Sequence, residues 1–440
     1  MKKIYKILIF CVLLVFSFCY VYFVLPLNMD GVWNYGFGYY VSKGLIPYVD
    51  FNMIIPPLWP LLLSLPIGFI GNTLITYYFI ICIIICFITL ICFKKIKYKT
   101  IFIYLLLLIY PHNGYNIFCL FLFLILLCIL YNDKYRDNDI LIAFVISLMF
   151  LTKQSFGILI IPSVIFSHSK KKTMCVYLIS FLLLFGYLII NNNLWEFLNY
   201  CFLGMLDFTS NGNDSQLYIF ISEIIVILYL IIILIKSKFK NYIVFYILFF
   251  QILVIPIFES SHFILAFIPV IYYFFITYDK IYRYLLCILL GVYLFGYYIQ
   301  VINVNMGDVG KIYINNNSFI NYKRLPRYTD YEFDMVKGYI NKYNNYKLFF
   351  LTSDAYIYML EYDMPVDKYN LINDGNMGYR GSKKYVNEID DYCSKNKCMF
   401  VIKSNEVVKN YNQVNREITG YVINKYLSIY SSDKLTFYIN

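Results

Sequence analysis

The sequence predicts an all-α polytopic membrane domain followed by a small α/β domain. Hydrophobic residues make up 61% of the 440 residues and charged residues only 14%, which is more apolar than a soluble domain of ordinary size requires. Many apolar runs approach about 20 residues, the length that crosses a hydrocarbon core of roughly 30 Å. From about Asn303 the charge rises and the long apolar runs stop. We therefore expect a transmembrane domain over residues 1–302 and a second domain over residues 303–440.

About eleven apolar segments are expected to be membrane spans. They are Ile7–Leu27, Thr73–Phe93, Thr100–Pro111, Asn116–Tyr131, Ile140–Thr152, Gln154–Ser167, Thr173–Ile190, Leu217–Ile235, Tyr242–Ile257, His262–Tyr278 and Tyr284–Ile302. The first is too long for an ordinary signal peptide and is expected to be a retained signal anchor. Thr100–Tyr131 and Ile140–Ser167 could each form one long helix instead. Merging either pair alone would move the later Lys-rich loops to the outside.

The distribution of Lys and Arg orients these spans. With a cytoplasmic N-terminus, the Lys-rich connections fall inside, and the outside loops before residue 303 hold only Lys43 and Lys153. This is the usual positive-inside bias, and it accounts for the net charge of +11 without a nucleic-acid partner. We expect a multi-pass cell-membrane protein in contact with lipids, with its C-terminal domain extracytoplasmic.

Residues 28–72 form the first external loop of this topology. Within it, Pro56–Gly71 is apolar, but it is short and carries four prolines. Counting this segment as a span would invert the charge pattern. We expect a helix lying at the outer interface of the membrane.

The C-terminal region alternates between strand and helix patterns, which indicates an α/β domain. The expected strands are Lys347–Ser353, Lys397–Ser404 and Lys434–Asn440. The expected helices are Asp354–Glu361, Ser382–Lys395 and Glu406–Ile429. Ten of the twelve cysteines lie in the membrane part, and an extracytoplasmic location would allow Cys393 and Cys398 to form a small disulfide loop.

Asp30 is the first candidate catalytic residue because it follows the first span directly, where lipid-borne substrates meet water. A carboxylate there can accept a proton from an attacking hydroxyl and favour an oxocarbenium-like centre. The alternative is a solvated acid that caps a loop. After Asp30 come aromatic residues, then Gly44-x-x-Pro47-Tyr48-x-Asp50, and then a return to the membrane at Pro56-Pro57.

This order resembles the first external loop of the GT-C glycosyltransferases, in particular bacterial relatives of protein mannosyltransferases and of lipid A aminoarabinose transferase. Leu151–Gly157 and Ser261–Pro269 resemble later motifs of some bacterial members more weakly. The resemblance implies a GT-C-like fold and sugar transfer, with inversion, from a polyprenyl-phosphate donor to a glycan, lipid or protein acceptor. It also implies that Asp30 is catalytic. The Asp-Glu pair familiar in the family is absent because Gly31 follows Asp30.

Other polar residues of the outer face are candidate substrate-binding residues. Lys153 lies between two short spans and could pair with the lipid phosphate, with Gln154 adding a hydrogen bond; the alternative is a snorkelling lysine. His262, with Glu259, could contact phosphate or acceptor. The remaining two candidates are Tyr48 and Asp50 of the first loop. The phosphate leaving group requires cations or a metal ion rather than a general acid, so a divalent cation is a possible cofactor.

Two other function classes remain open. An O-antigen ligase or polysaccharide polymerase would place essential Arg and His in a large late loop, but the loop after Ile190 holds no Lys, Arg or His. A lipid-linked sugar flippase or transporter would show repeated halves and charged residues near the middle of the membrane.

Overall fold

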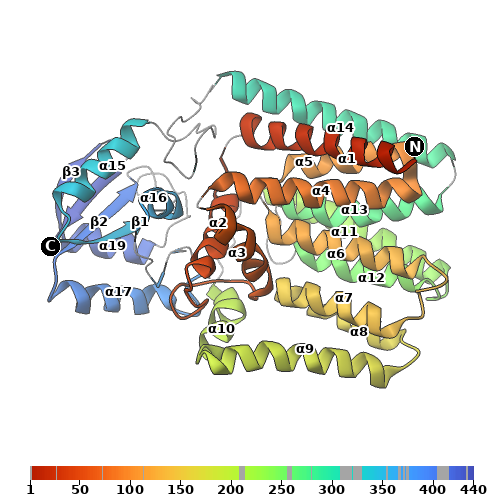
Figure 1. Cartoon of the computed structure of the whole chain (residues 1–440), viewed down its shortest axis with the longest axis horizontal. Coiled ribbons are helices and arrows are strands. Elements are labelled where there is room, and N and C mark those ends of the chain that lie inside the picture. Colours follow the sequence, from red (N-terminus) through yellow and green to blue (C-terminus); the bar gives the residue numbers. More distant parts are fainter. Residues whose placement is uncertain are drawn as a thin grey trace.

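A computed structural model places a helical bundle beside a small α/β domain, along the long axis of the molecule (Figure 1). The described residues are 2–25, 27–71, 73–111, 113–207, 214–254, 260–278, 280–307, 320, 330–352, 355–364, 368–369, 372, 376–403, 416–432 and 435–440. Short helices α2 (Met29–Ser42), α3 (Leu58–Ile70) and α10 (Leu194–Cys201) lie between the bundle and the α/β domain (Figure 1).

The bundle is built from long apolar helices that run along that axis. Its elements are α1 (Lys2–Phe18), η1 (Cys19–Val24), α4 (Leu74–Ile96), η2 (Lys97–Lys99), α5 (Thr100–Ile109), α6 (Gly114–Leu130), α7 (Asp139–Thr152), η3 (Gln154–Leu159), α8 (Ile160–Ile165), α9 (Lys170–Ile190), α11 (Asp214–Lys236), α12 (Tyr242–Phe250), η5 (Gln251–Val254), α13 (Ser260–Thr277) and α14 (Lys280–Gly307).

Five of these helical runs are long and apolar enough to cross a membrane. They are Ile7–Val24, Leu74–Ile109, Lys170–Ile190, Ile219–Lys236 and Ser260–Thr277. The expected spans Thr73–Phe93 and Thr100–Pro111 both fall within the single run Leu74–Ile109. Other expected spans appear as shorter apolar helices, for example Gly114–Leu130 and Asp139–Thr152. The structure therefore supports a membrane protein with several apolar helices, but it does not establish the expected number of about eleven spans.

The two places where adjacent helices could have merged are both broken. The chain leaves α5 at Tyr110 and re-enters a helix at Gly114, and it leaves α7 at Lys153, whose backbone is extended. The following η3 is a 3₁₀ helix. Such interruptions within an apolar bundle are tolerated where protein covers the freed backbone groups.

The Lys-rich connections gather at the end of the bundle opposite the α/β domain (Figure 1). At this end, His168 Nε2 lies 3.7 Å from Asp137 Oδ1, which joins two neighbouring connections. Lys99 Nζ lies 5.4 Å from the ring centre of Phe275. The bundle is thus polarised, with basic connections at one end and the first loop with the α/β domain at the other.

The first external loop contains two short helices, α2 (Met29–Ser42) and α3 (Leu58–Ile70), which pack closely. The Asn28 side chain accepts a hydrogen bond from the backbone N–H of Asp30 and begins α2 as an N-cap. Gly71, with φ of 101°, ends α3. Several apolar side chains of α3 are exposed: Leu61, Leu62, Leu65, Phe69 and Ile70. This exposed face is compatible with the expected interfacial helix.

The C-terminal domain contains a four-stranded sheet of order β1-β2-β4-β3. Its strands are β1 (Lys347–Leu351), β2 (Cys398–Lys403), β3 (Leu427–Ser431) and β4 (Leu435–Ile439). β1 pairs with β2 in parallel, and β4 is antiparallel to both β2 and β3. Its helices are α15 (Asp330–Lys342), α16 (Ala355–Glu361), α17 (Gly381–Cys393) and α19 (Arg416–Lys425).

One expectation for this domain was wrong and one was confirmed. The segment Glu406–Ile429 was expected to be a single helix, but α19 ends at Lys425 and β3 follows, because Leu427–Ser431 pairs with β4 and this pairing overrides the helical pattern. Residues 406–415 lie outside the described part. Cys393 and Cys398 form a disulfide, as the sequence allowed.

The α/β domain packs directly on α2. Tyr39 Oη donates to Asp363 Oδ1 at 2.8 Å, and the Asn52 backbone N–H donates to the Lys368 carbonyl at 2.7 Å. At the centre of this contact, Gly36 faces the ring of the buried Tyr356 on α16. Asp30 and the α/β domain are therefore at the same end of the bundle.

Substituting Gly36→Val should loosen this contact. A Cβ at Gly36 would lie 2.5 Å from two ring atoms of Tyr356, and overpacking of this kind costs typically about 1–3 kcal/mol. We expect a lower unfolding temperature and faster proteolysis of the α/β domain. Gly186→Val on α9 is the matched control, because no atom lies within 4 Å of its Cβ position. Equal stability of the two variants would show that α2 and α16 do not pack closely at Gly36.

Candidate functional site

Asp30 lies in the first turn of α2, half-buried, where the sequence placed the candidate catalytic acid. Trp33 Nε1 donates to Asp30 Oδ1 at 3.0 Å. Asn34 Nδ2 donates to the Asp30 carbonyl at 2.7 Å, and Asn34 Oδ1 accepts from Trp59 Nε1 of α3 at 3.2 Å. Side chains from two helices thus hold both the carboxylate and its backbone in position.

Two aromatic rings connect Asp30 to Lys153. The Trp33 ring lies 5.8 Å from the ring of Tyr115, measured between centroids. Lys153 Nζ lies 5.5 Å from the same Tyr115 ring. An acid from the first loop and a lysine from the break after α7 are therefore linked through two intervening aromatic side chains, although more than a hundred residues separate them in sequence.

The environment of Lys153 favours an anion. Its Nζ donates to Asn116 Oδ1 at 3.1 Å, and no salt bridge to it occurs among the described residues. Lys153 lies in the connection between two apolar helices, and burial lowers the pKa of its ammonium group to about 8. A half-buried cation without a carboxylate partner leaves its charge available to a ligand.

Two amide groups at the start of α6, one of which contacts Lys153, are further donors. Asn113, at the start of α6, and Asn116, in its first turn, are buried to 2% and 0% exposure. Neither Nδ2 group has a hydrogen-bond partner in the described part of the chain. The amino end of α6 also carries partial positive charge. The start of α6 therefore carries two amide donors that are unpaired among the described residues, and the Asn116 side chain also contacts Lys153 through its oxygen.

Close packing limits the space around this region. A Cβ added to Gly114 would lie 2.5 Å from Tyr77 Oη and 2.8 Å from Trp59. Tyr77 Oη accepts from the Gly114 backbone N–H at 3.1 Å. The first turn of α6 is thus held against α3 and α4, which positions Tyr115 and Asn116.

Tyr48 and Asp50 hold the first loop in shape. Tyr48 is buried, has φ of 70°, and donates from its hydroxyl to the Ile55 carbonyl at 2.6 Å. Asp50 Oδ2 accepts from the Ile46 backbone N–H at 2.7 Å. These contacts give both residues a structural role within the loop, and their expected contact with substrate stays a prediction.

Gln154 likewise joins parts of the scaffold. Its Nε2 donates to the Ile54 carbonyl at 3.1 Å and to the Cys201 carbonyl, at the end of α10 (Leu194–Cys201), at 2.8 Å. Gln154 therefore connects the first loop and α10 to the start of η3, directly after Lys153. We infer that Gln154 positions Lys153, while its expected hydrogen bond to substrate stays a prediction.

His262 lies in the first turn of α13 and is buried. The neighbouring η5 packs against both α13 and η3, and η3 begins one residue after Lys153. Glu259 lies outside the described residues. In the part of the chain that the structure describes, no three His, Cys, Asp or Glu side chains come together as a metal site.

Four residues of this region were not predicted from the sequence: Trp33, Tyr115, Asn113 and Asn116. The only signal for Trp33 was its position three residues after Asp30, which places both on one face if the segment is helical. Nor was Glu223 on α11 predicted, whose side chain is buried and whose carboxylate has no hydrogen-bond partner within the described residues. An isolated acid in an apolar segment was the available signal.

Comparison of the chain with protein-family models, with curated proteins and with solved structures finds no match.

Proposed function

We propose that this protein is an integral-membrane glycosyltransferase that uses a sugar linked to a polyprenyl phosphate. The observation that carries the proposal is the site joining Asp30 to Lys153 through Trp33 and Tyr115. A base and an anion-binding cation at one end of an apolar bundle are the two groups that such a transfer requires. The resemblance of the first external loop to the GT-C glycosyltransferases supports the same assignment.

In the proposed reaction, a hydroxyl oxygen of the acceptor attacks the anomeric carbon of the sugar. Asp30 accepts the hydroxyl proton as the new C–O bond forms. The bond between the anomeric carbon and the phosphate oxygen breaks, and the polyprenyl phosphate leaves with the electron pair. Lys153 balances the charge of this phosphate, and attack opposite the leaving group inverts the anomeric carbon.

Other parts of the molecule support Asp30 and Lys153 in the proposed reaction. Trp33 orients the carboxylate through its 3.0 Å hydrogen bond. The α/β domain is docked on α2, and in this proposal it takes part in receiving the acceptor. The acceptor is a glycan, a lipid or a protein on the outer face of the membrane. The reaction as written needs no metal ion, but a divalent cation beside the phosphate would supplement Lys153.

Transfer by the purified protein tests the proposal. The full chain in detergent or nanodiscs is given polyprenyl-phosphate sugars with different headgroups, and the released polyprenyl phosphate is measured. Nucleotide sugars serve as the comparison donors. Release from at least one lipid donor, and none from nucleotide sugars, is the expected result. Turnover with nucleotide sugars alone, or with no donor in a broad set, would contradict the proposal.

A transporter of lipid-linked sugars is the second candidate function, and Glu223 is the observation that favours it. Its buried carboxylate on α11, without a hydrogen-bond partner in the described residues, is the kind of intramembrane acid that transport proteins use. Reconstituted vesicles separate the two functions. A transporter moves the intact lipid-linked sugar across the bilayer, whereas a transferase breaks its sugar–phosphate bond.

A further inference from the structure

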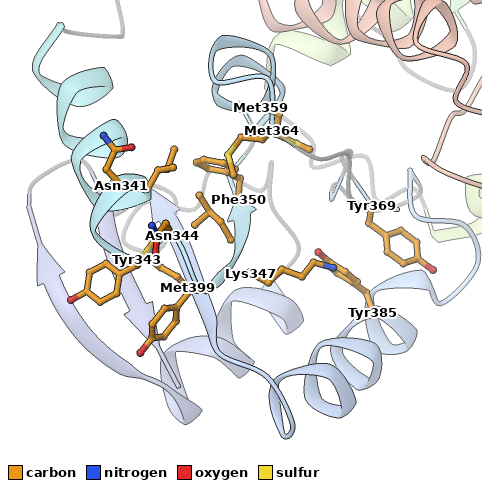
Figure 2. Close-up of a pocket in the computed structure, with 13 residues that line it drawn as sticks. Asn341, Tyr343, Asn344, Lys347, Phe350, Met359, Met364, Tyr369, Tyr385 and Met399 are labelled. Atoms are coloured by element: carbon orange, nitrogen blue, oxygen red, sulfur yellow. The ribbon is translucent and has the colours of Figure 1, made fainter.

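The α/β domain contains a cavity of about 400 Å³ along the edge strand β1, shown in Figure 2. Its walls come from β1, Met399 of β2, the end of α15 and the turn after it, α16 and the following Met364, Tyr369, and Tyr385 of α17. None of the residues of the Asp30 site lines it. The cavity is therefore distinct from the site of the proposed transfer.

Within the described part of the chain, β1 presents unpaired backbone groups on the side facing away from β2. β1 is at the edge of the sheet, and Lys347 is in register with Cys398 while its N–H donates to the Lys397 carbonyl. In a parallel pair, alternate residues direct both backbone groups at the neighbouring strand. The backbone groups of Leu348 and Phe350 consequently point away from β2. They have no hydrogen-bond partner among the described residues.

The side chains around the open edge form an apolar centre with a polar border. Figure 2 shows Met359 and Met364 close to Phe350, while Asn341 and Asn344 lie on the α15 side. Methionine side chains adapt to ligands of different shape and are frequent at binding surfaces with broad specificity. An apolar centre with polar surroundings is the usual composition of a peptide or protein interface.

We propose that the open edge of β1 binds an extended polypeptide segment of a partner protein, which adds to the sheet as a further strand. Only another backbone offers N–H and C=O groups that alternate with the spacing of Leu348 and Phe350. Every second side chain of the segment enters the cavity beside Phe350 and Met359. Lys347 is the only charged residue among the described residues that line the cavity, so a neutral or acidic segment fits.

The open edge of β1 lies close to the contact between the α/β domain and α2. Met364, which lines the cavity, follows Asp363, which accepts a hydrogen bond from Tyr39 of α2. A bound segment that contacts Met364 would therefore be separated from α2 only by Asp363 and the Tyr39 side chain. The proposal does not depend on Asp30 being catalytic, because a partner can be held here whether or not sugar is transferred.

Hydrogen exchange on the full chain in detergent tests the proposal. The probe is the tightest linear heptapeptide selected from a displayed random library. We expect this peptide to slow exchange of the Leu348 and Phe350 amides at least tenfold. The Phe349 amide, which bonds within the sheet, should change little. The proposal would be overturned if no peptide were selected. It would also be overturned if, in the free protein, the Leu348 and Phe350 amides already exchanged as slowly as the Phe349 amide.

Backbone variants separate strand addition from simple apolar contact. Leu348→Pro removes one outward N–H and leaves the bonds to β2 intact, since proline is tolerated at such a position of an edge strand. We expect peptide binding at least tenfold weaker than for Leu348→Ala. Equal binding by the two variants would overturn the proposal.

Methylated peptides give the same comparison on the wild-type chain. N-methylation at alternate positions of the peptide should abolish binding for one set of positions and spare the other. Equal effects at both sets would overturn the proposal. The same would follow if a neutral oligosaccharide slowed the Leu348 and Phe350 amides where no peptide does.

Discussion

Asp30→Asn should lower kcat for sugar transfer by about 10²- to 10⁴-fold, the usual contribution of a general base. The substitution keeps the size of the side chain and an oxygen that can accept the 3.0 Å hydrogen bond from Trp33 Nε1. It removes only the ability to take up the proton of the attacking hydroxyl. The KM for the lipid donor should change little, because the phosphate is held elsewhere. Initial rates over a range of donor concentrations measure both quantities.

The matched control for this variant is Asp133→Asn. Asp133 lies at the opposite, Lys-rich end of the bundle, and its side chain is 91% exposed. Its variant should retain wild-type turnover. If Asp30→Asn also retained turnover, Asp30 would have no role as the base and the proposed mechanism would be wrong. If both variants lost activity equally, the loss would reflect damage to the protein and not to the site.

The sequence predicted the parts of this structure that depend on local pattern. Short apolar and aromatic runs located β1, β2 and β4 to within a few residues, and long apolar runs located the helices of the bundle. The predicted break at Lys153 also appears, because Lys153 and Gln154 interrupt an otherwise apolar run. In each case neighbouring residues carry enough information without distant contacts.

The sequence could not predict features that distant contacts create. The segment Met29–Ser42 contains three glycines and five aromatic residues, which favour a loop, yet it forms α2 because it packs on α3 and α16. The contact between Trp33 and Tyr115 joins separate helices. No periodicity within either segment predicts it. Asp30 and Lys153 could thus be chosen individually, but their connection required the structure.

Lys153→Met should raise the KM for the lipid donor by about 10- to 100-fold and affect kcat less. A hydrogen bond to a charged group contributes about 1.5–3 kcal/mol, which corresponds to that range. Methionine preserves the length and apolar stem of the side chain but removes the charge. Lys43→Met is the control, since Lys43 is an exposed lysine in the same external loop region and contacts the Tyr39 ring. Initial-rate kinetics on both variants measure the difference.

The pH dependence of donor turnover tests whether the charge of Lys153 is what binds the donor phosphate. Burial lowers the pKa of Lys153 to about 8, so the group is a cation below that pH and loses its charge as the pH rises through it. The value of kcat/KM for the donor, which reports the free protein, should therefore fall about tenfold per pH unit above pH 8. Lys153→Arg keeps its charge there and should abolish this fall. A lysine that only packs against Tyr115 and Asn116 would give the same profile in the wild type and in the arginine variant, and that result would remove Lys153 from phosphate binding.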